Sequence, residues 1–253
     1  KNKPVTAQVL VCGGLGCLAK GAEAVYKRFQ ELIEKNQLSA TVEKTTDDHQ
    51  PSLKETGCIG LCEAGPLVRI EPKGILYLRV KPEDVDRIVE ETLINNRVVD
   101  DLVYQEETNQ EIRKWPLMKD VPFYRKQKKI VLRNCGSIDP EELDDYLFHD
   151  GYLALAKVVT TMSPDDVIGE ILKSGLRGRG GGGFPTGRKW QFARLSKSER
   201  KFIVCNGDEG DPGAFMDRSV MEGDPHTVIE GMAIAGYAFG AQEGYIYVRA
   251  EYP

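Results

Sequence analysis

The sequence of this 253-residue chain predicts an α/β protein built from two successive units, and three of its features indicate this. Apolar residues alternate between short strand-like runs and stretches with helical spacing. Four of the six cysteines stand in two close pairs near the N-terminus, and a glycine-rich loop followed by an acidic loop lies in the second half. Hydrophobic residues make up 41%, enough for a sizeable core, and the length suits one or two domains.

The composition excludes several classes of protein. A net charge of −5, from 34 basic and 39 acidic residues, argues against a general nucleic-acid binder. No apolar run approaches the roughly 18 residues of a membrane helix, so we expect no membrane span. Six cysteines are too few for a disulfide scaffold of this length, and no signal peptide is visible, so we expect a reducing, cytoplasmic setting.

Residues 1–95 are expected to form the first unit. Residues 9–11 and 40–46 read as strands, and residues 19–36 between them have apolar side chains at helical spacing. Residues 67–70 and 75–80 flank the turn Pro72-Lys73-Gly74 and predict a hairpin, after which Pro82 opens a helix. This order, strand–helix–strand and then hairpin–helix, predicts a thioredoxin-like fold.

Residues 96–125 are polar and weakly periodic, and we interpret them as a linker to a second unit over residues 126–253. Helix-start signals stand at residues 139–142 and 163–166, where a proline is followed by acidic residues. A strand at 202–205, a helix at 226–240 and a strand at 245–248 make a βαβ unit, which predicts a partly parallel sheet. Because the chain stops just after a strand, we expect this domain to be truncated on its C-terminal side.

The paired cysteines predict a metal site. The first pair has the spacing C-x4-C and the second C-x3-C, and both lie in glycine-rich loops that let the backbone approach a cluster closely. Core packing is improbable for four cysteines in this pattern. A structural zinc is the serious alternative, although zinc ribbons usually have C-x2-C spacing. Cys135 and Cys205 stand alone, and we interpret both as packing residues.

The glycine-rich loop lies within residues 174–190, and seven of the thirteen residues from Gly175 to Gly187 are glycine. Such a run costs conformational entropy, so close approach of the backbone to a flat or phosphorylated ligand is the natural explanation. Basic residues around it suit anionic groups. The loop formally contains G-x-G-x-x-G from Gly178, but it follows a predicted helix rather than a strand, so the usual dinucleotide-binding context is absent.

The acidic loop follows the predicted strand at 202–205. It carries Asn206, Asp208, Glu209 and Asp211, and carboxylates or amides at the end of a strand are well placed to bind ligand hydroxyls. A solvated surface turn is the alternative interpretation of these four residues.

Residues 5–95 resemble the thioredoxin-like [2Fe–2S] ferredoxin family, which includes the 24-kDa-type subunit of respiratory complex I. The resemblance rests on C-x4-C, a gap of about 40 residues and C-x3-C on this order of elements. It implies a [2Fe–2S] cluster with these ligands: Cys12, Cys17, Cys58 and Cys62.

Residues 120–253 resemble the NADH- and FMN-binding 51-kDa-type flavoprotein of complex I, through GRGGGGFPTGRKW and NGDEGDPGAFMDR. The resemblance implies a Rossmann-like domain with an FMN site that includes Gly178, Arg179, Gly180, Gly181, Lys189, Asn206 and Asp208. It also implies that Phe184 and Phe192 stack on the NADH adenine. Glu209 and Asp211 would border the flavin and the nicotinamide as the catalytic pair, although the family usually has Glu in place of Asp211. A [4Fe–4S] cluster of this family would have its ligands beyond Pro253.

Complex I keeps these two parts on separate chains, whereas here they are fused. The fusion, with Ala250 in RAEYP, resembles the β-type subunit of soluble NAD(P)-linked [FeFe]-hydrogenases and formate dehydrogenases, some of which are electron-bifurcating. The resemblance implies a diaphorase-type oxidoreductase subunit that passes electrons between NAD(H) or NADP(H) and iron–sulfur clusters through FMN.

The implied assembly is a hetero-oligomer. Its partners would be a hydrogenase or formate dehydrogenase catalytic subunit, a small [2Fe–2S] subunit and, in a bifurcating enzyme, ferredoxin. A non-catalytic assembly subunit with a structural zinc remains the alternative from a different class.

Overall fold

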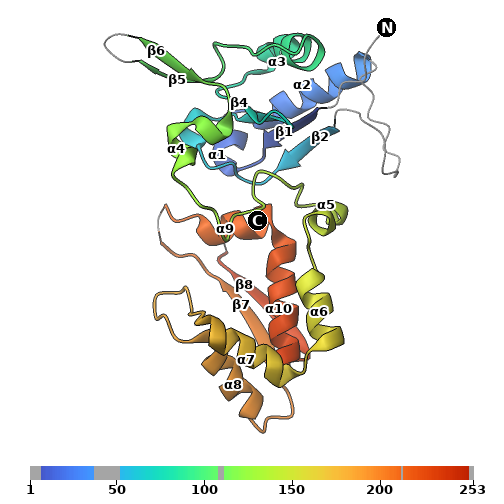
Figure 1. Cartoon of the computed structure of the whole chain (residues 1–253), viewed down its shortest axis with the longest axis vertical. Helices are drawn as coiled ribbons and strands as arrows, with labels where there is room; N and C mark the ends of the chain where they lie inside the picture. Colours follow the sequence, from blue (N-terminus) through green and yellow to red (C-terminus); the bar gives the residue numbers. More distant parts are fainter. Residues whose placement is uncertain (1–6, 37–51, 108–110, 212, 251–253) are drawn as a thin grey trace. The chain divides into compact units, whose positions relative to one another are not determined.

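The structure is a computed structural model, and it describes residues 7–36, 52–107, 111–211 and 213–250. Its contacts divide the chain into two compact units, Lys1–Asp139 and Pro140–Pro253. Helices and strands occur in both units, which Figure 1 shows in the colours of the sequence. The predicted α/β class is confirmed.

A four-stranded sheet forms the centre of unit 1. Its strands are β1 (Gln8–Cys12), β2 (Ser52–Thr56), β3 (Val68–Glu71) and β4 (Ile75–Tyr77), in the order β2-β1-β3-β4. β1 and β2 are parallel, whereas β3 is antiparallel to both β1 and β4. Because Cys12 lies opposite Thr56 in the parallel pair, the loops that follow β1 and β2 leave the sheet at the same end.

The helices of unit 1 follow from its apolar pattern. α2 (Ala22–Lys35) begins after Gly21, whose φ of 93° suits a residue without a side chain, and it buries Val25, Phe29 and Leu32. α3 (Pro82–Ile88) begins at a proline, and the Asp84 carboxylate accepts a hydrogen bond from the Lys81 backbone N–H. α2 packs against β1 and α3. Three shorter helical segments are α1 (Leu15–Leu18), η1 (Cys62–Ala64) and η2 (Val89–Ile94).

These elements confirm the predicted first strand, its helix, the hairpin and the helix at Pro82. The strand predicted at residues 40–46 lies outside the described residues. The strand that pairs in parallel with β1 among the described residues is β2, which the sequence pattern did not indicate. The SLKET sequence of β2 is polar, so it carries little of the apolar signal on which strand prediction depends.

The segment from 96 to 125, predicted as a linker, packs on unit 1. It forms β5 (Tyr104–Glu107), β6 (Ile112–Trp115), η3 (Met118–Asp120) and α4 (Pro122–Arg125). The Leu78 N–H donates to the Leu102 carbonyl at 2.7 Å, and Val99, Val103 and Val121 join the hydrophobic core. The compact unit therefore extends to Asp139, past the predicted boundaries at 95 and 126. The apolar residues of this segment are isolated along the sequence, so their spacing shows neither helical nor strand periodicity.

Unit 2 combines helices with a two-stranded parallel sheet, β7 (Phe202–Gly207) and β8 (Glu243–Val248). Its helices are α5 (Leu143–Phe148), α6 (Leu153–Thr161), α7 (Pro164–Ser174), α8 (Thr186–Leu195), α9 (Met216–Gly223) and α10 (Pro225–Phe239). α10 packs against α6, α7, α8, α9 and β7 (Figure 1). The predicted β7–α10–β8 order and the parallel pairing are confirmed.

A buried carboxylate joins α10 to α5 and to the start of α6. Glu230 on α10 is only 8% exposed, and its carboxylate accepts hydrogen bonds from the Tyr146 hydroxyl and from the backbone N–H groups of Tyr152 and Leu155. The last two lie at the N-terminal end of α6, where helix N–H groups have no partner within the helix. Glu230 thus satisfies donors on two other elements.

Within the part of the chain that the structure describes, no helix has both the length and the apolar character required to cross a bilayer.

Candidate functional site

The four paired cysteines meet at one end of the unit 1 sheet. Cys12 ends β1 and Cys17 lies in α1, whereas Cys58 and Cys62 come shortly after β2. The Sγ atoms of Cys58 and Cys62 are 3.8 Å apart, and the Cys12 side chain interacts with those of both Cys17 and Cys58. The parallel pairing of β1 and β2 brings the two cysteine loops together, as a shared metal site requires.

Glycines line this cluster of sulfurs at close range. A Cβ atom placed on Gly65 would lie 2.7 Å from the Cys17 Sγ, and one on Gly16 would lie 2.9 Å from the Cys62 Cβ. On Gly14 it would lie 3.1 Å from the Cys58 Sγ. The backbone therefore approaches three of the four cysteines so closely that a side chain would fill the space they need. This cradle is the observation that fits a compact iron–sulfur cluster.

The surroundings of the sulfurs affect their protonation. Cys12 is fully buried, and the backbone N–H of Ile59 lies 3.4 Å from its Sγ. The interaction with Cys17 and burial together raise the pKa of Cys12 to about 11, while the same interaction lowers the pKa of Cys17. Lys20 donates from Nζ to the carbonyl oxygens of Cys62 at 2.9 Å and Glu63 at 2.7 Å, so a positive charge holds the second cysteine loop.

The arrangement distinguishes between the two predicted kinds of metal site. A structural zinc needs four ligands around a single ion, whereas a [2Fe–2S] cluster spreads four cysteines over two irons. Among the described residues, which include all four paired cysteines, no group of three or more Cys, His, Asp or Glu side chains could hold one metal ion. The glycine-lined convergence of four thiols fits a [2Fe–2S] cluster with two cysteines on each iron.

We expect Gly65→Ala to reduce cluster content several-fold, because the new Cβ would stand 2.7 Å from the Cys17 Sγ. Iron and acid-labile sulfide analysis of the purified protein, with the visible spectrum, measures the loss. Gly169→Ala is the matched control, since a Cβ there meets no other atom within 4 Å. Equal cluster content in the two variants would contradict the close packing of glycine against sulfur.

The glycine-rich loop connects α7 to α8 in unit 2. Its ends are held together by two backbone hydrogen bonds, from Gly178 N–H to Phe184 O and from Thr186 N–H to Leu176 O, both 2.9 Å. Between these bonds, Cβ atoms on Gly180, Gly181 and Gly182 would meet nothing within 4 Å. The loop is thus a closed turn with an open, side-chain-free interior, as close approach to a flat ligand requires.

The remaining predicted residues of this segment lie on or beside the loop. Arg179 is exposed within it, while Lys189 and Phe192 lie on α8. The rings of Phe184 and Phe192 have centroids 6.4 Å apart and are 50% and 61% exposed. The two aromatic rings therefore stand near one another with surface available for stacking.

The acidic loop begins where β7 ends. The Asn206 Oδ1 accepts a hydrogen bond from the Asp208 backbone N–H at 3.0 Å, which forms a local turn. The Glu209 carboxylate accepts from the backbone N–H groups of Met216 at 2.7 Å and Asp217 at 3.1 Å, at the N-terminal end of α9. Asp211 lies further along, where its carbonyl accepts from the Ala214 N–H.

Two cationic side chains hold these loops: the sequence indicated Arg177 only as positive charge around the glycine-rich loop, and it gave no sign of Arg249. Arg177 donates from Nε to the Gly183 carbonyl and braces the glycine-rich loop, while Arg249 donates from Nη1 to the Glu209 carbonyl at 2.8 Å. Arginine in a glycine-rich or strand-end segment gives no signal by itself of which carbonyl it will meet. The structure brings the four cysteines together and places the predicted flavin-site residues in unit 2, on the glycine-rich loop and α8, and on the end of β7 and the acidic loop that follows it. Their roles in ligand binding stay predictions.

Four converging cysteines on one α/β unit, and an open glycine loop with a polar strand-end loop on the next, define an iron–sulfur flavoprotein. Residues 1–93 match the thioredoxin-like [2Fe–2S] ferredoxin family, and residues 171–253 match the family described as the Nuo51 FMN-binding domain. The predicted resemblance is confirmed, as are the [2Fe–2S] and FMN cofactors.

Individual relatives agree with this assignment. The chain is 60% identical over 129 residues to the NADP-reducing hydrogenase subunit HndC of Solidesulfovibrio fructosivorans, a match that covers 51% of this chain and 26% of that subunit. It is 55% identical over 124 residues to an NADH-quinone oxidoreductase subunit of Aquifex aeolicus, covering 49% of this chain and 29% of the relative. The matches thus span less than a third of the length of these relatives.

Among solved structures, the thioredoxin-like [2Fe–2S] ferredoxin of Aquifex aeolicus is 33% identical to this chain. That match covers 40% of this chain and 97% of the ferredoxin, with a TM-score of 0.33.

Proposed function

We propose that the chain is the electron-entry part of a diaphorase-type subunit, which passes electrons between NAD(P)H and iron–sulfur clusters through FMN. The observation that carries the proposal is the presence, on one chain, of four cysteines gathered in a glycine cradle and a separate α/β unit with an open glycine loop. A site for one-electron chemistry and a site for a flat, phosphorylated cofactor are the two parts that such a subunit needs.

In this proposal, the residues of the chain bind, orient and shield the cofactors. Cys12, Cys17, Cys58 and Cys62 hold the cluster, and the backbone from Gly178 to Gly181 leaves room for the FMN. Arg179 and Lys189 supply positive charge for phosphate groups, and Asn206 and Asp208 bind hydroxyl groups. When bound, FMN exchanges a hydride with the nicotinamide and single electrons with iron–sulfur clusters.

The remaining site residues position the substrate. Phe184 and Phe192 present exposed rings on which an adenine can stack. Glu209, fixed by the backbone of α9, sets the position of the acidic loop beside the flavin, and Asp211 borders the nicotinamide.

A hydrogenase is the assembly that we propose for this subunit, with a hydrogenase catalytic subunit, a small [2Fe–2S] subunit and ferredoxin as partners in a cytoplasmic, electron-bifurcating hetero-oligomer. The 60% identity to a subunit of an NADP-reducing hydrogenase supports this choice over a formate dehydrogenase. Affinity purification of the tagged chain from its native cells distinguishes the two. Recovery of a formate dehydrogenase catalytic subunit in place of a hydrogenase subunit would overturn the proposed assembly.

An anaerobic visible spectrum, taken before and after addition of NADH or NADPH, tests the electron-transfer function. We expect broad sulfur-to-iron absorption together with a flavin band, and both should bleach when the reduced nucleotide is added. A colourless protein that contains zinc would contradict the redox function and favour an assembly subunit. Comparison of the two nucleotides determines which of them the flavin site accepts.

We expect Asp208→Ala to weaken FMN binding about tenfold, the equivalent of one charge-assisted hydrogen bond. The Asn206 Oδ1 accepts from the backbone N–H of Asp208 and does not contact the Asp208 side chain. The local turn should therefore survive the substitution. Flavin fluorescence during titration of the deflavinated protein measures the affinity. Asp144→Ala, an exposed acid on α5, is the control, and an unchanged affinity for FMN in Asp208→Ala would remove Asp208 from the site.

A further inference from the structure

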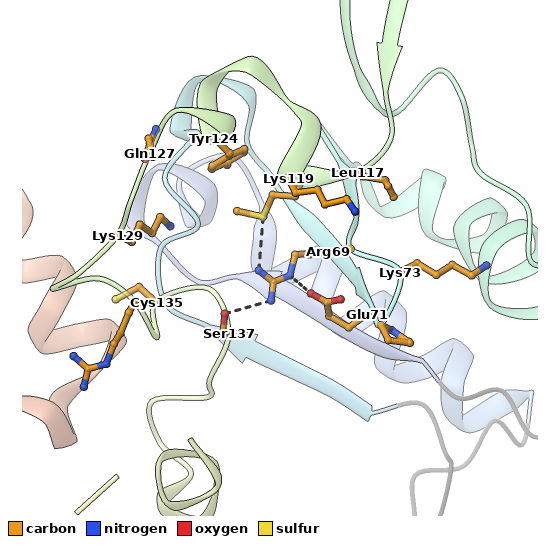
Figure 2. A pocket seen from close by; sticks show the side chains of 14 residues that line it. Arg69, Glu71, Lys73, Leu117, Lys119, Tyr124, Gln127, Lys129, Cys135 and Ser137 are labelled. Carbon is orange, nitrogen blue, oxygen red and sulfur yellow. Dashed lines mark hydrogen bonds and ion pairs between the residues drawn. The ribbon is translucent and has the colours of Figure 1, made fainter. Parts of the chain in front are cut away.

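A pocket of about 530 Å³ lies in unit 1, outside both of the sites described above (Figure 2). The β3–β4 hairpin forms one wall, and the other is formed by the segment from residue 117 to residue 137, which includes η3 and α4. The volume falls in the range of small-molecule sites, which is roughly 300–1,000 Å³. The paired cysteines do not line it, although two of its lining residues, Tyr124 and Lys129, lie near enough to those cysteines to interact with them electrostatically.

Arg69 stands among the residues that line the pocket and forms an ion pair with Glu71. Its guanidinium side chain is 13% exposed, and Nε lies 2.9 Å from the Glu71 carboxylate but outside hydrogen-bonding geometry within the described chain. Its other contacts are long: Nη1 to the Met118 sulfur at 3.6 Å and Nη2 to the Ser137 hydroxyl at 3.4 Å, as the dashed lines in Figure 2 show. Burial lowers the pKa of Arg69, and the charge of the Glu71 carboxylate acts in the opposite direction.

Two further donors line the same hollow. The Tyr124 side chain on α4 is 8% exposed, and its hydroxyl has no hydrogen-bond partner among the described residues. A buried hydroxyl without a partner costs free energy, and a phosphate oxygen in the pocket would supply an acceptor. Lys129 is half-buried and donates from Nζ to the Ile59 carbonyl at 3.2 Å, which leaves two of its three N–H donors for another acceptor.

The charge of the residues that line the pocket indicates the class of ligand that it would bind. Five cationic residues and one acidic residue, Glu71, line the pocket, and one of the five, Lys73, donates to the Asn96 side chain. The cationic residues are Arg69, Lys73, Lys119, Lys129 and Arg133. This excess stands out in a chain whose net charge is −5. Guanidinium forks and ammonium groups, together with a hydroxyl donor, are the groups that bind phosphate oxygens.

We propose that this pocket binds a small molecule that carries phosphate groups. The Arg69 guanidinium, the Tyr124 hydroxyl and the Lys129 ammonium donate to the phosphate oxygens, and Arg133 adds charge at the mouth. Binding compensates the buried guanidinium and satisfies the tyrosine hydroxyl.

Isothermal titration of the full chain, with its cluster and FMN in place, uses pyrophosphate as the probe at low ionic strength. We expect saturable binding that weakens about tenfold in Lys129→Gln and measurably in Tyr124→Phe. Because Lys129 also contacts the Ile59 carbonyl, Arg133→Gln provides a second charge variant at an exposed position. Lys27→Gln, whose lysine is 65% exposed and pairs with Glu23 on α2, is the matched control and should bind as the unmodified protein does.

Hydrogen exchange with and without pyrophosphate locates the binding, since the FMN and nucleotide site also accepts phosphate groups. We expect slower exchange over residues 117–137. Three results would overturn the proposal: no saturable binding, equal affinity in all four variants, or protection confined to the glycine-rich loop at 175–189. Binding of a polyglutamate peptide in preference to pyrophosphate would likewise overturn it, because the pocket would then be a protein contact.

Discussion

Cys58→Ser is expected to abolish the [2Fe–2S] cluster and to leave the FMN content unchanged. Cys58 lies between two neighbours in the group of thiols, since it interacts with Cys12 and stands 3.8 Å from the Cys62 Sγ. A cluster of this kind needs all four cysteines, so the loss of this one removes half of the protein ligands of one iron. The predicted FMN residues lie in unit 2, and the cysteines lie in unit 1.

Iron, sulfide and released FMN are measured on the same preparation, together with the electron paramagnetic resonance spectrum of the reduced protein. Cys205→Ser is the matched control, because Cys205 lies in β7 of unit 2 and should leave the cluster intact. Loss of both cofactors in Cys58→Ser would contradict the independence of the two units. A full cluster in that variant would exclude Cys58 as a ligand.

Glu230→Ala is expected to have the largest effect on stability, a decrease of about 3 kcal/mol in the free energy of unfolding. The carboxylate is buried and accepts from the Tyr146 hydroxyl and from two backbone N–H groups at the N-terminal end of α6. Its removal leaves these donors without an acceptor and opens a cavity between α10 and α6. Urea unfolding followed by circular dichroism measures the change.

Glu199→Ala is the control for this experiment, because Glu199 is exposed and surface substitutions rarely change stability by more than about 0.5 kcal/mol. Glu230→Gln keeps an acceptor oxygen but cannot ionise. An unfolding free energy in Glu230→Ala that matches the control would contradict the structural role of this carboxylate.

The contribution of Glu230 is also expected to depend on pH. Burial by itself raises the pKa of Glu230, but hydrogen bonds from Tyr146 and the α6 backbone outweigh burial and hold that pKa below its ordinary value of 4.5. The folded state therefore binds the proton less tightly than the unfolded state. The stabilisation is complete above pH 4.5 and is lost as the pH falls through the lowered pKa. The stability difference between the unmodified protein and Glu230→Gln should shrink as the pH falls below 4.5; a constant difference would contradict this sign.

Local patterns predicted the elements whose apolar residues repeat regularly. The spacing of Val25, Phe29 and Leu32 indicated α2, and the run at residues 202–205 indicated β7. Prediction failed where the pattern was weak. β2 is polar, and the segment from 96 to 125 contributes isolated residues such as Val103 and Val121 to a core formed mainly by other elements.

The cysteine pairs and the glycine-rich loop could be recognised for a different reason. Close pairs of cysteine and runs of glycine occur in few structural settings. Cysteine in close pairs and glycine in a run are costly choices that a ligand explains, so the residue types predicted a metal site and a site for a flat or phosphorylated ligand, and the family resemblance implied [2Fe–2S] and FMN. The sequence placed Glu209 in the acidic loop but did not predict its hydrogen-bond partners. The bonds that its carboxylate accepts from Met216 and Asp217 depend on where α9 begins.

The sequence alone predicted the α/β class, a metal site at the paired cysteines and a ligand-binding glycine loop, because residue type and local spacing carry that information. Tertiary structure decided which residues became neighbours across long separations. It placed the Gly65 backbone against Cys17, Glu230 beneath α6, and Arg69 beside Tyr124 and Lys129. Such contacts follow from strand pairing and helix packing, which bring together side chains that no local pattern links.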